Sequence, residues 1–150
     1  MANLYAVSPA SARPDVTAAL TRGVCRLFRD LGYAPLQEFK LANGRRADVA
    51  ALDRRGRLAI VEVKSCRADF ESDMKWAEYL GYCDLFYFAV DRTFPCALLP
   101  ASEGLIVADA YGGAIMRDAE ERPMNAARRK AVTLRFARQA ARRAVCAFSP

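Results

Sequence analysis

The sequence predicts a single mixed α/β domain over residues 1–150, in which a β-sheet is flanked by helices. Three observations predict this fold class. Apolar residues recur at helical spacing from Val16 to Leu31, two apolar runs at 47–52 and 58–63 read as strands, and a further strand at 85–90 comes after a second helical stretch. Strands and helices in this succession build layered α/β folds, and a chain of this length needs only one core.

Turn and capping residues delimit the elements of the first half. Pro14 and Asp15 form a helix-initiation signal, and Gly32 ends the helical spacing. Asn43-Gly44 is a strong turn dipeptide, and Gly56 closes the loop before the third strand. The expected elements are a loose N-terminus (1–14), a helix (16–31), an extended segment (33–41) and a hairpin of two strands (47–52 and 58–63).

The second half begins with a helix that Asp69 can cap and that runs to about Leu80. Two proline-punctuated stretches follow the strand at 85–90. The remaining expected elements are strands at 105–108 and 114–116 and a long final helix at 125–147. One face of this last helix is apolar and most of its arginines lie on the other; the apolar face consists of Ala127, Ala131, Leu134, Ala141 and Val145.

Residue types that are absent restrict the chemistry. The chain has no histidine, and its five scattered cysteines form no CxxC pair, which argues against structural zinc and against the usual catalytic triads. Any catalysis must rest on carboxylates, Lys, Tyr or a hard metal ion. No signal peptide and no apolar run of the ~20 residues of a membrane span is recognisable, so we expect a cytoplasmic, nucleoid-associated protein without membrane contact.

The net charge of +6 is concentrated at the C-terminus. Residues 126–150 contain seven Lys or Arg and no Asp or Glu, whereas the rest of the chain is nearly balanced. A basic helix of this kind favours a polyanion, most often nucleic acid, as partner, and a solvated helix face is the alternative. The arginines expected to contact a DNA backbone are Arg128, Arg129, Arg135, Arg138, Arg142 and Arg143.

Three charged residues interrupt the apolar hairpin. Asp48 lies in its first strand, and Glu62 and Lys64 lie at the end of its second. Because side chains alternate across a strand, Glu62 and Lys64 share one face. Buried without partners, such charges would cost free energy, so they either reach solvent or take part in chemistry.

The turn of the hairpin decides whether the two acids meet. With Gly56 in the left-handed position of a three-residue loop, Asp53 faces Arg57, and Asp48 then lies opposite Glu62. A two-residue loop would shift the pairing by one and place the carboxylates on opposite faces of the sheet. The chemistry predicted here requires the first register.

Two carboxylates directly across a strand pair repel each other unless a cation lies between them. Oxygen ligands without His or Cys suit Mg²⁺ or Mn²⁺, which also bind phosphate oxygens. The hypothesis is a metal site for phosphodiester cleavage, with Asp48 and Glu62 as ligands, Lys64 orienting or activating the attacking water, and Arg45 and Arg46 holding the polyanion. The alternative is a surface Glu–Lys pair beside an unrelated Asp.

The succession of Asp48 and then Glu62-Val63-Lys64 on the next strand, after one helix and before another, resembles the PD-(D/E)XK nuclease core. The resemblance implies a restriction-endonuclease-like mixed sheet flanked by helices, in which the Asp and Glu bind Mg²⁺ and the Lys assists the nucleophilic water. The stretch from Lys75 to Tyr79 is similar to the QxxxY motif of RecB-like nucleases, with Lys75 in the place of Gln and a nucleic-acid contact as its expected role.

Three longer stretches are similar to the MmcB family of bacterial DNA repair proteins, a resemblance that covers roughly residues 17–144. They are GRRADVAALDRRGRLAIVEVKS, RADFESDMKWAEYLGYCDLFYFAV and GLIVADAYGGAIMR. This resemblance implies a nuclease-like protein that acts on DNA in repair or damage tolerance, with other repair or translesion-synthesis proteins as further partners.

One departure from the nuclease pattern concerns the first helix. Many members of that superfamily carry a metal-binding Glu there, where this chain has Thr21, and Glu38 is a candidate substitute. The leading hypothesis is a Mg²⁺-dependent DNA endonuclease. The alternatives are a non-catalytic DNA-binding or adaptor module that recruits repair proteins, and an RNA-directed nuclease. Asp69 and Asp73, on one face of the second helix, either cap it or form a second site.

Overall fold

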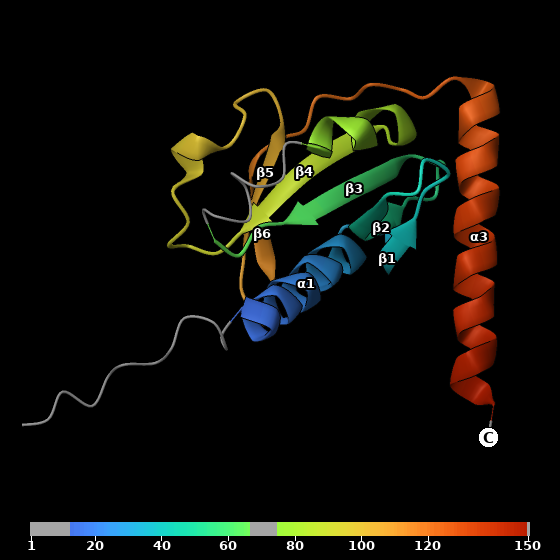
Figure 1. Ribbon diagram of the computed structural model, residues 1–150, viewed down its shortest axis with the longest axis horizontal. Helices are drawn as coiled ribbons and strands as arrows, with labels where there is room; N and C mark the ends of the chain where they lie inside the picture. The colour runs from blue at the N-terminus through green and yellow to red at the C-terminus, as the bar shows by residue number, and fades with distance from the viewer. Residues whose placement is uncertain (1–12, 67–74, 150) are drawn as a thin grey trace, which may run out of the picture.

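A computed structural model of the chain describes residues 13–66 and 75–149. Within these ranges a six-stranded sheet carries helices on both faces and along one edge (Figure 1). The elements in chain order are α1 (Arg13–Asp30), β1 (Ala34–Lys40), β2 (Arg46–Leu52), β3 (Leu58–Val63), the 3₁₀ helix η1 (Lys75–Tyr82), β4 (Leu85–Val90), the 3₁₀ turn η2 (Cys96–Leu98), β5 (Gly104–Ala108), β6 (Gly113–Arg117) and α3 (Ala126–Phe148).

The strands lie in the order β1-β2-β3-β4-β5-β6, so neighbours in the chain are neighbours in the sheet. The pairs β1–β2, β2–β3 and β5–β6 are antiparallel, whereas β3–β4 and β4–β5 are parallel. Parallel neighbours need a crossover, and the segments that contain η1 and η2 supply it. The mixed α/β sheet predicted from the sequence is confirmed.

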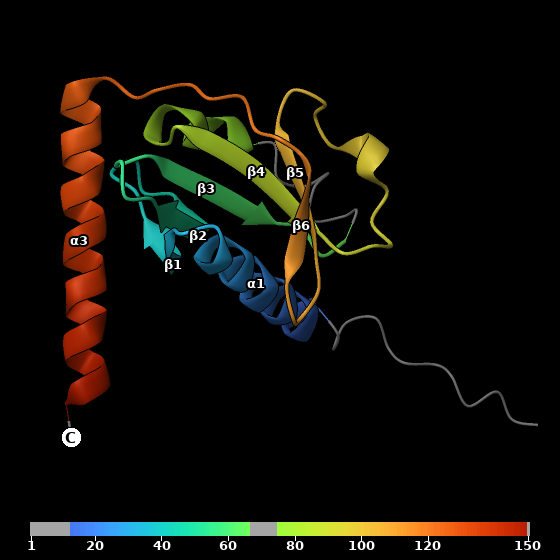
Figure 2. The ribbon, with the colours of Figure 1, turned by 180° about the vertical axis from the view of Figure 1, so that it is seen from behind.

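Each face of the sheet has its own apolar core. On one face α1 packs through Leu20, Val24 and Phe28 against β-strand residues that include Val61 and Ile106. The other face is rich in aromatic side chains and is covered by η1 and part of α3; its buried residues include Phe39, Ile60, Tyr79, Phe86, Phe88, Val132 and Phe136. Both ribbon views show α1 running across the sheet and α3 lying at the edge of the sheet, beside β1 (Figures 1 and 2).

The helix α3 lies against the edge strand β1. The Gln139 side chain accepts a hydrogen bond from the Lys40 N–H (3.0 Å) and donates one to the Lys40 carbonyl (2.8 Å). Arg143 donates to the carbonyls of Gln37 and Glu38. These side chains satisfy backbone groups that an edge strand otherwise presents to other chains.

The start of α3 is bound by a buried acid, Asp84, which directly precedes β4. Asp84 accepts hydrogen bonds from the backbone N–H groups of Leu58 (2.8 Å) and Met124 (3.0 Å). The guanidinium of Arg129 binds both of its carboxylate oxygens, at 2.6 and 2.9 Å, and also donates to the Gly56 carbonyl. Asp84 therefore connects β3, β4 and α3.

The face of α3 that packs on the sheet is not the apolar face expected from the sequence. Val132 and Phe136 are buried, whereas Leu134 and Val145 are 55% and 67% exposed. The remaining residues of that predicted face, Ala127, Ala131 and Ala141, are exposed as well. Phe136 is larger than any side chain of the predicted face, three members of which are alanines, so packing Val132 and Phe136 on the sheet buries a large apolar area.

The other predicted elements agree with the structure to within three residues, the largest difference being the start of α1, with one exception. Residues 75–82 form a 3₁₀ helix where an α-helix was expected, and residues 67–74, including Asp69 and Asp73, lie outside the described residues. Trp76 and Tyr79, three positions apart, both stack on Phe86, and side chains at that spacing line up in a 3₁₀ helix.

Candidate metal and nucleic-acid site

The hairpin has the register on which the metal hypothesis depends. β2 and β3 pair with Leu52 opposite Leu58 and Val49 opposite Val61. The loop contains Gly56 with φ +83°, and the Asp53 N–H donates to the Arg57 carbonyl (3.0 Å). This register carried one position further places Asp48 opposite Glu62, as the three-residue loop predicted.

At Asp48 and Glu62, hydrogen bonds from backbone N–H groups to side-chain carboxylates replace the backbone pairing of β2 with β3. The Asp48 N–H donates to Oε1 of Glu62 (3.2 Å), and the Val63 N–H donates to Oδ2 of Asp48 (2.8 Å). Each carboxylate thus binds the backbone of the opposite strand. The two acids that the sequence predicted to converge do lie together, at the end of the hairpin remote from its turn.

The site is electrostatically unfavourable for a negative charge on Asp48. Burial raises the pKa of this carboxyl above its ordinary value, and the charge of Glu38 raises it further. The Val63 N–H, the charge of Lys64 and a hydrogen bond with the Glu62 side chain act in the opposite direction, but they do not cancel the effect of burial. A bound cation would favour the charged form.

Lys64 follows the two acids at the end of β3. Its N–H donates to the Ala89 carbonyl (2.9 Å), so its backbone continues the parallel pairing of β3 with β4. The residue is buried, at 4% exposure, and so is Glu62 at 5%. The positive charge of Lys64 lowers the pKa of Asp48, so this side chain acts electrostatically on the acids of the hairpin.

Glu38 lies on β1 directly across from Asp48, because Gln37 pairs with Val49 and Phe39 with Ala47. Its φ of +51° is in the left-handed region, which costs a non-glycine residue about 1 kcal/mol. Glu38 and Asp48 line a cavity of about 330 Å³ under the first half of α1. Its remaining lining residues are Thr17, Ala18, Thr21, Arg22 and Gln37. Thr21 thus lies by the site, as the comparison with the nuclease pattern expected.

Asp48 and Glu62 offer carboxylate oxygens, which are the ligand atoms that Mg²⁺ and Mn²⁺ prefer. Within residues 13–66 and 75–149, no group of three or more His, Cys, Asp or Glu side chains is arranged to hold a metal ion. Magnesium sites often use only one or two protein carboxylates and take their other ligands from water and phosphate. Asp48 and Glu62 meet that smaller requirement, and both offer hard oxygen donors.

The predicted DNA-binding residues near the hairpin are partly engaged within the protein. Arg45 forms an ion pair with Glu78 (2.6 Å). Arg46 is exposed, and its carbonyl accepts a hydrogen bond from the hydroxyl of Tyr79 (3.0 Å). Lys75 is exposed at the first position of η1. The tyrosine of the QxxxY-like stretch therefore ties η1 to β2.

The basic residues of α3 differ in their surroundings. The guanidinium of Arg128 lies over the ring of Tyr82, 4.2 Å from its centroid, and Arg129 is bound to Asp84. By contrast, four basic side chains line a cavity of about 360 Å³ between α3 and β1: Lys40, Arg135, Arg138 and Arg142. We call these four residues the basic groove; no acidic residue is among those that line its cavity.

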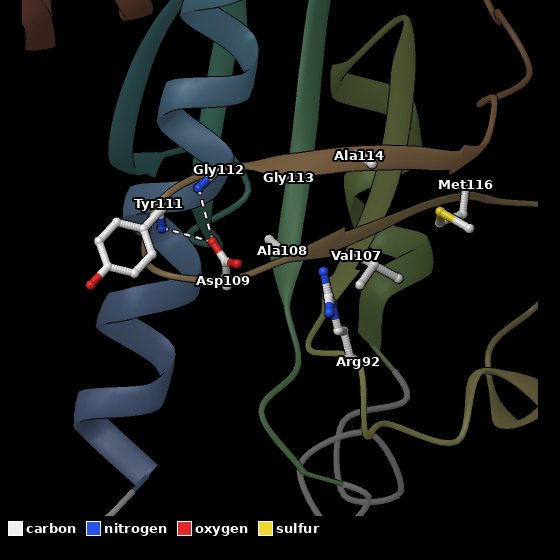
Figure 3. A pocket seen from close by; sticks show the side chains of 9 residues that line it. All are labelled: Arg92, Val107, Ala108, Asp109, Tyr111, Gly112, Gly113, Ala114 and Met116. Atoms are coloured by element: carbon white, nitrogen blue, oxygen red, sulfur yellow. Dashed lines mark hydrogen bonds between the residues drawn. The ribbon is translucent and has the colours of Figure 1, made fainter.

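A larger cavity of about 630 Å³ lies elsewhere, on β5 and β6 (Figure 3). Its one carboxylate, Asp109, accepts hydrogen bonds from the backbone N–H groups of Tyr111 (2.8 Å) and Gly112 (3.1 Å) and so holds the β5–β6 turn. The rest of the lining is mainly apolar, with Arg92 on one side. It lacks the paired carboxylates of the candidate site.

Several residues that shape the site were not identified from the sequence. Arg22 and Thr17 reach it from α1, and Gln139 binds β1 from α3. Arg143, which was expected at a DNA backbone, also donates hydrogen bonds to β1. Arg22 is one of several exposed arginines on α1, and no local pattern distinguishes it from Arg26. Only the packing of α1 over β1 and β2 brings it to the cavity.

Comparisons with known proteins agree with the resemblance found in the sequence. The structure is similar to the SPO1766 protein of unknown function from Silicibacter pomeroyi, with a TM-score of 0.81 and 48% sequence identity over 83% of this chain and 85% of that one. No curated protein matches. No helix in the described part of the chain is long and apolar enough to cross a membrane. A family profile, DNA repair protein MmcB-like, matches residues 6–149, and the chain therefore belongs to the MmcB-like family, whose name suggests a role in DNA repair.

Proposed function

We propose that the protein is a divalent-metal-dependent nuclease of the PD-(D/E)XK type that hydrolyses phosphodiester bonds in DNA. The observation that carries the proposal is the convergence of Asp48 and Glu62 where β2 and β3 leave the regular ladder, next to the buried Lys64. The strand order β1-β2-β3-β4, with α1 on one face, is consistent with that superfamily's core.

Asp48 and Glu62 would hold Mg²⁺ or Mn²⁺, and the metal would supply Lewis-acid activation of a water and of the phosphate. Lys64 supplies a fixed positive charge beside the reacting phosphate and orients or activates the attacking water. Burial of Glu62 and Lys64 restricts the freedom of both side chains, which favours a preorganised site.

DNA is the proposed substrate because the family name refers to DNA repair and because the basic groove presents four cations in a cavity whose described lining residues include no acid. Contacts from such side chains to phosphates give affinity without sequence preference. Replacing Arg135, Arg138 and Arg142 together by Glu should abolish most of the salt-dependent affinity for duplex DNA. The same affinity and salt slope in the triple variant would remove the groove from the proposal.

The catalytic proposal is tested by incubating the protein with branched, single-stranded and duplex DNA in Mg²⁺ or Mn²⁺. The wild type should cleave at least one substrate, while Asp48→Ala and Lys64→Ala should lose cleavage and keep their fold by circular dichroism. Cleavage that persists in both variants would assign the activity to another site or to a contaminant. RNA of the same structures, run in parallel, tests the RNA-directed alternative.

A second function, a non-catalytic DNA-binding or adaptor module for repair proteins, is favoured by one feature. Thr21 stands where many of these nucleases carry a metal-binding Glu, and the described residues contain no metal group of three or more side chains. DNA binding without cleavage in either metal would select this function over the nuclease.

A further inference from the structure

The cavity beside Asp48 contains an arginine that nothing in the sequence pattern assigned to function. Arg22 of α1 lines it, facing a lining that also includes Glu38 and Asp48. Two hydroxyl residues of α1, Thr17 and Thr21, complete this side, and the Thr21 hydroxyl donates to the Thr17 carbonyl (2.8 Å). The cavity therefore joins two carboxylates from the sheet to one guanidinium from the helix.

Arg22 keeps its hydrogen-bonding groups available. Although two carboxylates line the same cavity, no ion pair and no side-chain hydrogen bond joins Arg22 to any residue in the described ranges. The guanidinium group is a planar fork of donors that matches the oxygens of a phosphate. Arg129 shows the contrast, because Asp84 binds its fork on both oxygens.

A phosphodiester in this cavity would meet the negative charges of Glu38 and Asp48. The phosphodiester therefore needs nearby positive charge to bind. A divalent ion held by Asp48 and Glu62 would supply positive charge on the side of the sheet only. Arg22 lines the cavity from the helix, where it can supply positive charge on the side of α1. Arg22 is the one cationic side chain among the described residues that line the cavity, and its guanidinium offers the donors that phosphate oxygens accept.

We propose that Arg22 is a phosphate anchor. It binds one backbone phosphate of the DNA strand, and the adjacent phosphate of the same strand lies at Asp48 and Glu62. This inference rests on the proposed function and deepens it, because it makes α1 a second DNA-contacting element besides α3. The strand then passes the mouth of the cavity that α1, β1 and β2 line.

The test compares Arg22→Gln with Arg26→Gln. Arg26 is an exposed arginine one turn further along α1 that does not line the cavity, so it matches Arg22 in charge and helix. Binding of fluorescent duplex and single-stranded DNA is measured by anisotropy in Ca²⁺ and in EDTA, over a range of salt concentrations.

In Ca²⁺, Arg22→Gln should weaken binding about tenfold and lower the salt slope by about one phosphate contact, because one charge-assisted hydrogen bond is lost. In EDTA the loss should shrink, since the uncompensated carboxylates then repel the phosphate. Arg26→Gln should change binding little in either condition, and Arg22→Lys should restore part of the affinity.

Equal losses for Arg22→Gln and Arg26→Gln, or wild-type binding by Arg22→Gln in Ca²⁺, would overturn the anchor. These outcomes are separable from failure of the nuclease proposal. If only the anchor fails, Ca²⁺ still strengthens DNA binding by the wild type and not by Asp48→Asn. If the nuclease site itself fails, Ca²⁺ has no Asp48-dependent effect, and the anchor fails with it.

Discussion

Two acidic residues, Asp84 directly before β4 and Asp48 in β2, have opposite electrostatic environments. Burial alone would raise the pKa of Asp84, but Arg129 and the backbone N–H groups of Leu58 and Met124 outweigh it and hold the pKa below its ordinary value. Burial, assisted by the charge of Glu38, raises the pKa of Asp48, because its one backbone donor, from Val63, and the charge of Lys64 do not outweigh it.

The two acids differ in whether the chain itself compensates their negative charge. The charge of Asp84 is compensated within the chain and ties α3 to β3 and β4, so it contributes to stability. The charge of Asp48 is left incompletely compensated, which costs free energy that natural sequences accept chiefly where a ligand or a reaction uses it. The predictions below test this contrast in order of expected effect.

The largest effect is expected when the compensated acid is removed. Asp84→Asn should lower the free energy of unfolding by about 3 kcal/mol, because it leaves the Arg129 charge without its partner and weakens the start of α3. Asp48→Asn should leave stability unchanged or raise it. Urea unfolding of both variants beside the wild type measures this, and equal losses would contradict the contrast.

The two acids should also respond to pH with opposite sign. The pKa of Asp84 is lowered in the folded state, so its contribution is full above the ordinary value of 3.8 and is lost as pH falls through the folded pKa below that value. The pKa of Asp48 is raised, so its cost at neutral pH is relieved as pH falls through the raised value towards 3.8.

The measurement is the difference in unfolding free energy between the wild type and each variant from neutral pH to about pH 4. Relative to Asp48→Asn, the wild type should become more stable as pH falls through this range. Relative to Asp84→Asn, its advantage should remain nearly constant. A wild type that loses stability against Asp48→Asn on acidification would show that the Asp48 pKa is not raised.

The smallest effect is expected at Glu38, whose charge is a secondary cause of the raised pKa of Asp48. Glu38→Gln should lower that pKa and raise stability at neutral pH by less than about 1 kcal/mol. Carboxyl NMR titration of Asp48 gives the shift directly. Asp30→Asn, an exposed acid at the end of α1 that does not line the cavity, is the matched control and should leave the titration unchanged.

Local sequence signals predicted the hairpin and its paired acids. The left-handed Gly56 and the Asp53 that faces Arg57 set the register, and the register alone brings Asp48 to Glu62. Turn chemistry acts over a few residues, so a single sequence reveals it.

Contacts between distant segments were not predictable in this way. Arg129 was expected at a DNA backbone, yet it lies 45 residues from the Asp84 that it binds, and no spacing rule joins them. The packing face of α3 was missed because the helix carries two apolar stripes. Helical periodicity detects both but does not say that the Val132 and Phe136 stripe meets the sheet.

The central claim, that Asp48 and Glu62 form a site for a divalent cation, is tested most directly by calorimetric titration of Mn²⁺ into the wild type, Asp48→Asn and Asp84→Asn. The wild type should bind Mn²⁺ more tightly as pH rises, because the ion must displace the proton that the raised pKa of Asp48 retains. At a temperature where it is folded, the Asp84→Asn variant should bind Mn²⁺ with the affinity of the wild type. The Asp48→Asn variant should not bind Mn²⁺. Identical isotherms for the wild type and Asp48→Asn would contradict the claim.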